Sequence, residues 1–237
     1  MVTLVQTTKS DAMAAIRSFL LDILPPGVEV VNGLDNRVSE PTSLDFCTLT
    51  PISSVRLETN STDFIDVFFQ GSVSGTALTV STVYLGTVKV GQKLFGENIP
   101  ANTYITGTTT GGYTINKSLT LSSQPIASGY RVDNIPMQNT FQCDVHGPNS
   151  FNNSQIITGM YRSDWAVDTF ANDSTSVSPL YCTDPRQAAF KNGEQQIEER
   201  WTLDLTVQCN NQIVVPQDYF DEAEVTGVVA VDVFYPA

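Results

Sequence analysis

Ten residues near the end of the chain, 200–209, alternate strictly between apolar and polar side chains. The apolar positions are Trp201, Leu203, Leu205, Val207 and Cys209. Successive side chains of a β-strand point to opposite faces, so this period of two predicts a strand with one face on a core and the other toward water. Such a strand needs a sheet that is covered on one side.

Residues 140–146 repeat the pattern. Phe141, Cys143 and Val145 share one face, while Gln142, Asp144 and His146 share the other, which we expect to face solvent. Shorter β-prone runs occupy 44–51, 54–58, 64–69 and 177–182. The run at 225–235 is almost continuously apolar, which indicates burial of both faces, within the subunit or against a neighbour.

Two segments have helical spacing instead. Residues 9–24 place Met13, Ile16, Leu20 and Ile23 on one stripe, Thr8 and Asp11 resemble a capping box, and two prolines follow. The second segment, residues 150–170, is expected to be one helix capped by Asn149 or Ser150. Strands with helices on one face and no βαβ alternation predict an α+β fold, an antiparallel sheet with two helices packed on it.

The composition changes between residues 71 and 126, which are rich in Thr, Ser and Gly and lack Cys, His and Trp. Three lysines against one glutamate give this segment a net charge of +2, and because the chain carries −13 the remainder carries −15. Short β-prone pieces there alternate with turn residues. We therefore expect a small all-β domain, residues 71–131, inserted into a discontinuous α+β domain made of residues 1–70 and 132–237.

The net charge of −13 argues against a protein that holds nucleic acid through its phosphates, because that affinity depends heavily on lysine and arginine releasing counterions. Acidity would suit a conduit through which DNA slides, although acidic surfaces also simply keep proteins soluble. No apolar run approaches the ~20 residues that cross a bilayer, and the first residues lack a secretory signal. We expect synthesis in the cytoplasm and no membrane partner.

The residues that commonly carry chemistry are few. Cys47, Cys143, Cys182 and Cys209 lie far apart without a CxxC pair and are expected to be reduced core residues. The single histidine, His146, lies two positions from Asp144, but two ligands do not make a metal site. The glycine-rich run 107–112 precedes a β-prone run and is expected to be a tight turn.

Carboxylates gather at 194–199 and at 218–224. The second cluster (Asp218, Asp221, Glu222, Glu224) could bind calcium, but it lacks the regular calcium loop, so solvated charge in a connecting segment is the expected role. No serine-hydrolase elbow or phosphate loop occurs. We therefore expect no catalytic, cofactor-binding or metal-binding residues and no enzyme.

Several segments resemble a family of neck or tail-terminator proteins from long-tailed bacteriophages. They are TLTP at 48–51, RLETN at 56–60, DVHGPNS at 144–150, PLY at 179–181, DPR at 184–186 and NGEQQIEERW at 192–201. The resemblance covers most of residues 1–70 and 132–237. The segments GSVSGTALTV (71–80), VGQKL (90–94) and GGYTI (111–115) look like a Gly/Thr-rich β module inserted into many phage particle proteins.

The resemblance implies a structural virion protein made in the bacterial host cytoplasm. It implies a homohexameric ring at the head-tail junction that terminates the tail tube and joins it to the neck and connector, with genomic DNA only passing through. A contractile tail of the myovirus type would add the sheath as a partner. The alternatives are a head-completion protein on the connector side, a decoration or adhesion module acting through the β insert, and an unrecognised hydrolase.

Overall fold

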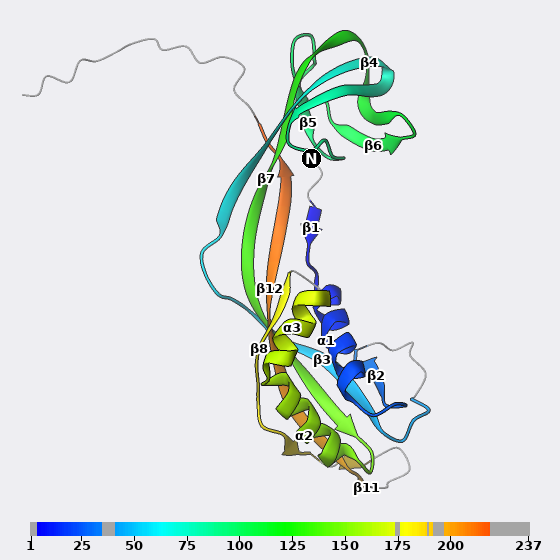
Figure 1. Ribbon diagram of the computed structural model, residues 1–237, viewed down its shortest axis with the longest axis vertical. Coiled ribbons are helices and arrows are strands. Elements are labelled where there is room, and N and C mark those ends of the chain that lie inside the picture. The colour runs from blue at the N-terminus through cyan, green and yellow to red at the C-terminus, as the bar shows by residue number, and fades with distance from the viewer. Residues whose placement is uncertain (1–3, 35–40, 174–175, 189, 192–196, 219–237) are drawn as a thin grey trace, which may run out of the picture. The chain divides into compact units, whose positions relative to one another are not determined.

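A computed structural model describes residues 4–34, 41–173, 176–188, 190–191 and 197–218 (Figure 1). The described residues form three helices, α1 (Lys9–Ile23), α2 (Ser150–Tyr161) and α3 (Asp164–Asp173). Their strands are β1 (Leu4–Gln6), β2 (Glu29–Asn32), β3 (Phe46–Arg56), β4 (Ser61–Leu85), β5 (Lys93–Phe95), β6 (Ile105–Thr109), β7 (Gly112–His146), β8 (Val177–Cys182), β9 (Arg186–Gln187), β10 (Phe190–Lys191), β11 (Ile197–Glu198) and β12 (Arg200–Pro216). The strand predicted at 225–235 lies outside the described residues.

The chain divides into two compact units. The α+β unit contains the described residues of 4–63 and 132–214, and the β unit contains residues 64–131 together with residues 215–218. Three strands, β4, β7 and β12, have residues in both units. That residues 71–131 form an inserted domain remains a prediction.

The sheet of the α+β unit has the strand order β1-β12-β7-β3-β2. Strand β3 pairs antiparallel with the end of β7, from Phe46 opposite His146 to Arg56 opposite Met137. Strand β2 runs parallel to β3. Three short strands, β9, β8 and β1, pair antiparallel with successive stretches of β12. Both alternating segments, 140–146 and 200–209, are therefore strands, as predicted.

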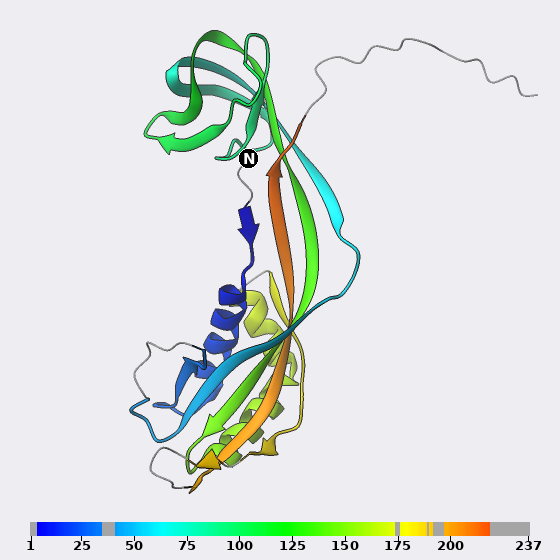
Figure 2. The same cartoon turned by 180° about the vertical axis from the view of Figure 1, so that it is seen from behind.

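The three helices lie on one face of this sheet (Figure 1), and in the view from behind the strands lie in front of α2 and α3 (Figure 2). Their buried side chains join the inward residues of β3, β7, β8 and β12 in one core. Phe19 of α1 contacts both other helices, with 5.6 Å between its ring centroid and that of Tyr161 and 5.4 Å to that of Phe170. These contacts confirm the predicted α+β fold.

The first helix is confirmed together with its cap. The Thr8 hydroxyl accepts a bond from the Asp11 amide, and the Asp11 carboxylate accepts one from the Thr8 amide, so two amides at the open helix end are satisfied. At the other end, Leu24 donates its amide to the Leu20 carbonyl before Pro25 and Pro26. Proline lacks the amide that a further helical turn would need.

The prediction of a single second helix over 150–170 is wrong, because the chain forms α2 and α3. Between them, the Ser163 hydroxyl donates to the Met160 carbonyl, and the Arg162 guanidinium bonds to the Cys182 carbonyl and Asp184. The predicted cap is also wrong: Asn149 occupies the N-cap position without a side-chain cap bond. Its backbone and side-chain amides donate instead to Asp45.

The β unit contains most of β4, all of β5 and β6, and the first part of β7. Strand β4 turns back on itself near Gly75, whose φ of +64° suits glycine. A separate core fills the unit, formed by Val67, Phe69, Val73, Leu78, Val88, Leu94, Ile105, Ile115 and Ile126. Residues 87–92, within this β-prone region, form no strand and lead through a turn at Gly91, which has φ +94°, into β5.

Candidate functional site

The polar face of β7 is buried near the C-terminal end of the strand, whereas we predicted that it faces solvent. Asp144 is 7% exposed and His146 is 6% exposed. The Asp144 carboxylate accepts a 2.6 Å hydrogen bond from the Thr202 hydroxyl and two from the Gln142 amide nitrogen, at 2.9 and 3.0 Å. Buried carboxylates need such donors, because an unpaired charge is costly to desolvate.

His146 is held by packing as well as by charge. Its ring stacks on Phe46 with 4.4 Å between centroids, and its Nδ1 lies 3.4 Å from Oε1 of Glu198. Burial lowers the pKa of His146 below its ordinary value, although the nearby carboxylates of Glu198 and Asp144 oppose this shift. Within the described ranges, no group of three His, Cys, Asp or Glu side chains is placed to hold a metal. The cluster is best explained as part of the folded core.

The glycine-rich run 107–112 forms the turn between β6 and β7, where Thr109 pairs with Gly112. A side chain at Gly112 would collide with the Leu78 carbonyl, so glycine is required by this close approach. The predicted tight turn is confirmed, and no helix N-terminus follows it.

The two acidic clusters are only partly described. Glu199 accepts a 3.1 Å hydrogen bond from the Trp201 indole, and Glu198 lies beside His146. Asp218 forms an ion pair with Lys93. Residues 194–196 and 219–224 lie outside the described residues, so the prediction that neither cluster binds calcium or performs catalysis stays a prediction.

All four cysteines are buried and unpaired, as predicted. A hydrogen bond with Cys47, together with burial, raises the pKa of the Cys143 thiol, and burial raises the pKa of Cys182 and Cys209. Since the thiolate is the reactive form, the raised pKa values of these three thiols favour small core residues over nucleophiles.

Exposed apolar side chains gather on two strands, a feature that our sequence reasoning missed. In the α+β unit, Ile52, Val55 and Leu57 are exposed at and just beyond the end of β3. In the β unit, Phe64, Phe68 and Tyr84 are exposed on β4. Large apolar side chains gathered on an exposed surface mark contact surfaces. The available signal was the run 64–69, where apolar residues occupy both alternating sets and so cannot all face one core.

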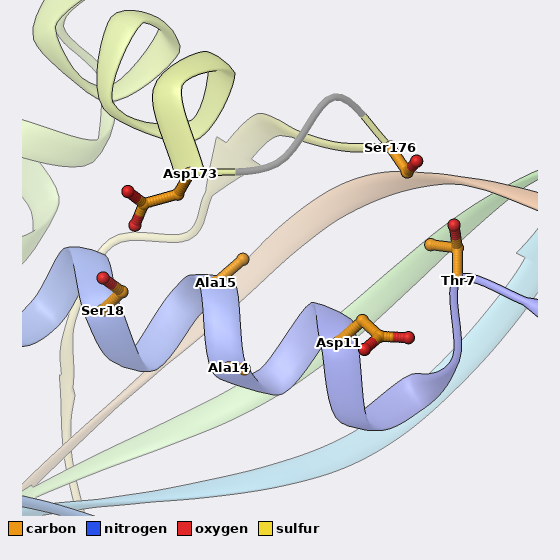
Figure 3. A pocket seen from close by; sticks show the side chains of 7 residues that line it. All are labelled: Thr7, Asp11, Ala14, Ala15, Ser18, Asp173 and Ser176. Carbon is orange, nitrogen blue, oxygen red and sulfur yellow. The ribbon is translucent and has the colours of Figure 1, made fainter. Parts of the chain in front are cut away.

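Helix α1 has hollows on two sides. One, of about 500 Å³, lies between α1 and the end of α3 and is lined by Thr7, Asp11, Ala14, Ala15, Ser18, Asp173 and Ser176 (Figure 3). The other, of about 420 Å³, lies between α1 and β2 and has a more apolar lining that includes Met13, Val30 and Leu49. Ala14 borders both, so the exposed side of α1 combines small side chains with concave flanks.

The two units differ in charge. The α+β unit has eight basic residues against 18 acidic ones, a net charge of −10, whereas residues 64–131 and 215–218 of the β unit have four against three, a net charge of +1. No helix in the described part of the chain is long and apolar enough to cross a membrane. The acidic surface belongs mainly to the larger unit.

Comparison with known proteins gives one family. Residues 83–230 match the family described as "Phage neck terminator protein". No curated protein gives a significant match. The match covers more than half of the 237 residues and includes β5 to β12 together with α2 and α3, whereas α1 and β1 to β3 lie outside it. The resemblance to phage neck terminators is thereby confirmed, and the chain belongs to the phage neck terminator family.

Proposed function

We propose that the protein forms a homohexameric ring at the head-tail junction of the virion, where it terminates the tail tube and joins it to the neck and connector. The observation that carries this proposal is the family match over residues 83–230. Exposed apolar side chains at and just beyond the end of β3 support it, because large apolar side chains gathered on the surface of a soluble protein mark contacts with other proteins. The function lies in assembly rather than in converting a substrate.

Growth of a tube of stacked rings must be stopped by a subunit that offers a different outer face, since exposed strand edges otherwise recruit further subunits. In this proposal the exposed side of α1, with its two hollows, receives a neighbouring copy. The small side chains of Ser10, Ala14 and Ser18 allow close approach there.

The net charge of −10 on the α+β unit suits a channel through which DNA moves. Phosphates are repelled by carboxylates, and without lysine or arginine contacts no condensed counterions are released to favour binding. Genomic DNA therefore passes through the ring without being held. In a contractile tail, the sheath would be a further partner.

The role is tested by electron microscopy of particles made by a phage that lacks this gene. We expect free heads together with tails of irregular length, because nothing stops tube growth. Complementation with the wild-type gene should restore uniform tails. Normal tails beside heads that lose their DNA would instead assign the protein to head completion on the connector side.

Ring formation is tested with a pair of matched substitutions. Ala14→Arg places a long charged side chain between the two hollows of α1, and Gln155→Arg places the same side chain on the exposed side of α2. Light scattering should give six subunits for the wild type and for Gln155→Arg, and monomers for Ala14→Arg. Circular dichroism should be unchanged in both variants. An intact hexamer with Ala14→Arg would remove α1 from the interface.

A further inference from the structure

The outward face of β4 in the β unit carries three exposed aromatic rings. Phe64 is 63% exposed, Phe68 is 41% exposed and Tyr84 is 59% exposed. Because β4 doubles back, Phe68 and Tyr84 lie side by side, with 5.6 Å between their ring centroids. The alternate residues Val67 and Phe69 are buried in the unit's own core, so this strand is apolar on both faces. The outward face, defined as Phe64, Phe68 and Tyr84, lacks a cover among the described residues.

The last described residues of the chain reach this face. The Gln217 amide nitrogen donates a 3.0 Å hydrogen bond to Oδ1 of Asp66. Asp66 lies between Phe64 and Phe68 in the alternation of β4, so its carboxylate shares their side of the strand. The next residue, Asp218, forms an ion pair with Lys93 of β5. The chain beyond Asp218 therefore starts beside the exposed rings.

The sequence beyond this point has the right character to cover them. From Val225 onward, one alternating set has no polar side chain, whereas the other combines two polar residues, Thr226 and Asp232, with Val228, Ala230 and Phe234. A strand of this kind has one strongly apolar face and one mixed face. Six residues, 219–224, separate it from Asp218 and can span about 20 Å when extended, which is enough to bring the segment over β4.

We infer that residues 225–235 lie across the outward face of β4 in the same chain, with their apolar set against Phe64, Phe68 and Tyr84. The attachment through Gln217 and Asp218 keeps the segment at a high local concentration next to the face, on the order of millimolar for a short linker. A free second copy at lower concentration competes poorly with such a tether. The inference stands apart from the proposed ring, because both partners belong to one subunit.

The test uses the full-length protein with a photo-crosslinking benzoylphenylalanine in place of Phe64. Mass spectrometry identifies the peptide that is captured. A mixture of unlabelled and 15N-labelled protein, incubated before irradiation, distinguishes links within one chain from links between two chains. We expect links to peptides within 225–235, with both halves carrying the same isotope. The same amino acid at Thr109, an exposed position of β6, is the control and should not capture this segment.

Two substitutions in the segment sharpen the result. Val231→Asp puts a charge into the apolar set, so capture from position 64 should fall about tenfold or more, because an unpaired carboxylate is costly to bury. Thr226→Asp puts the same charge into the mixed set and should leave capture nearly unchanged. Links that join the two isotopes would show that a second copy supplies the cover. Absence of any link to 225–235, or equal loss in both variants, would overturn the inference.

Discussion

The buried pair Asp144 and His146 shows what a single residue position contributes in this protein. The alternation of β7 correctly predicted which side chains share a face, and Phe141, Cys143 and Val145 are core residues. It did not reveal that the opposite face is covered too. A period of two assigns side chains to a face, whereas the cover of that face comes from residues distant in sequence, here Phe46, Glu198 and Thr202.

His146 makes stability depend on pH. Because burial lowers its pKa in the folded state, the unfolded chain binds a proton first as the pH falls through the ordinary histidine value near 6.5. The free energy of unfolding should therefore decrease from pH 8 toward the lowered folded pKa and then level off. Urea denaturation at pH 8.0 and 5.5 measures the loss, and His146→Gln should flatten it. An identical loss in the variant would assign the effect to other groups.

Removing one of the hydrogen-bond donors to the Asp144 carboxylate should lower the stability of the protein. Thr202→Val keeps the shape of the side chain but deletes the 2.6 Å hydrogen bond to a carboxylate that is 7% exposed. We expect the free energy of unfolding to fall by about 1–3 kcal/mol. Thr120→Val, at an exposed strand position, is the matched control and should change it by less than about 0.5 kcal/mol. Equal effects of the two substitutions would contradict this role for Thr202.

At the scale of elements, α1 was predictable because its signals are local. Thr8, Asp11 and the two prolines lie within or next to the helix that they delimit. The break between α2 and α3 was not, since apolar spacing continues through it. The Arg162 guanidinium donates to the Cys182 carbonyl and to the Asp184 carboxylate, which lie about 20 positions later in the chain. Tertiary contacts of this kind leave no trace in helical periodicity.

The cap of α1 gives a prediction at this scale. Thr8→Ala removes the hydroxyl that accepts from the Asp11 amide, and the loss of an N-cap costs about 1 kcal/mol. Thermal denaturation should show a lower midpoint. Ser10→Ala, in the first turn of the same helix, should be neutral or slightly stabilising because alanine favours the helix. A midpoint unaffected by Thr8→Ala would mean that water replaces the cap without loss.

For the whole molecule, the sequence was sufficient to predict the fold class and the family, because both depend on strand alternation and on segments spread along much of the chain. The grouping of residues 215–218 with the β unit was not foreseeable. It depends on specific contacts, Gln217 with Asp66 and Asp218 with Lys93, between positions more than 100 residues apart. Composition separates segments along a chain but does not show which distant segment folds beside them.

The charge of the whole chain predicts its behaviour toward nucleic acid. With a net charge of −13, the protein should give no change in the fluorescence anisotropy of a labelled DNA duplex, even at about 50 mM salt, where basic proteins bind most strongly. A basic DNA-binding protein measured in parallel is the control. Salt-sensitive binding would show that a local basic surface outweighs the overall charge and would argue against a conduit that merely lets DNA pass.

The division of the β unit between two stretches of chain has a genetic consequence. Its described residues are encoded at 64–131 and again at 215–218, on both sides of residues 132–214 of the α+β unit. A recombination event between related phages that exchanged only the first stretch would separate Asp66 and Lys93 from Gln217 and Asp218. Viable exchanges should therefore replace both stretches together. Natural hybrids of this gene should have their crossover points before the first stretch or after the second, and not between them.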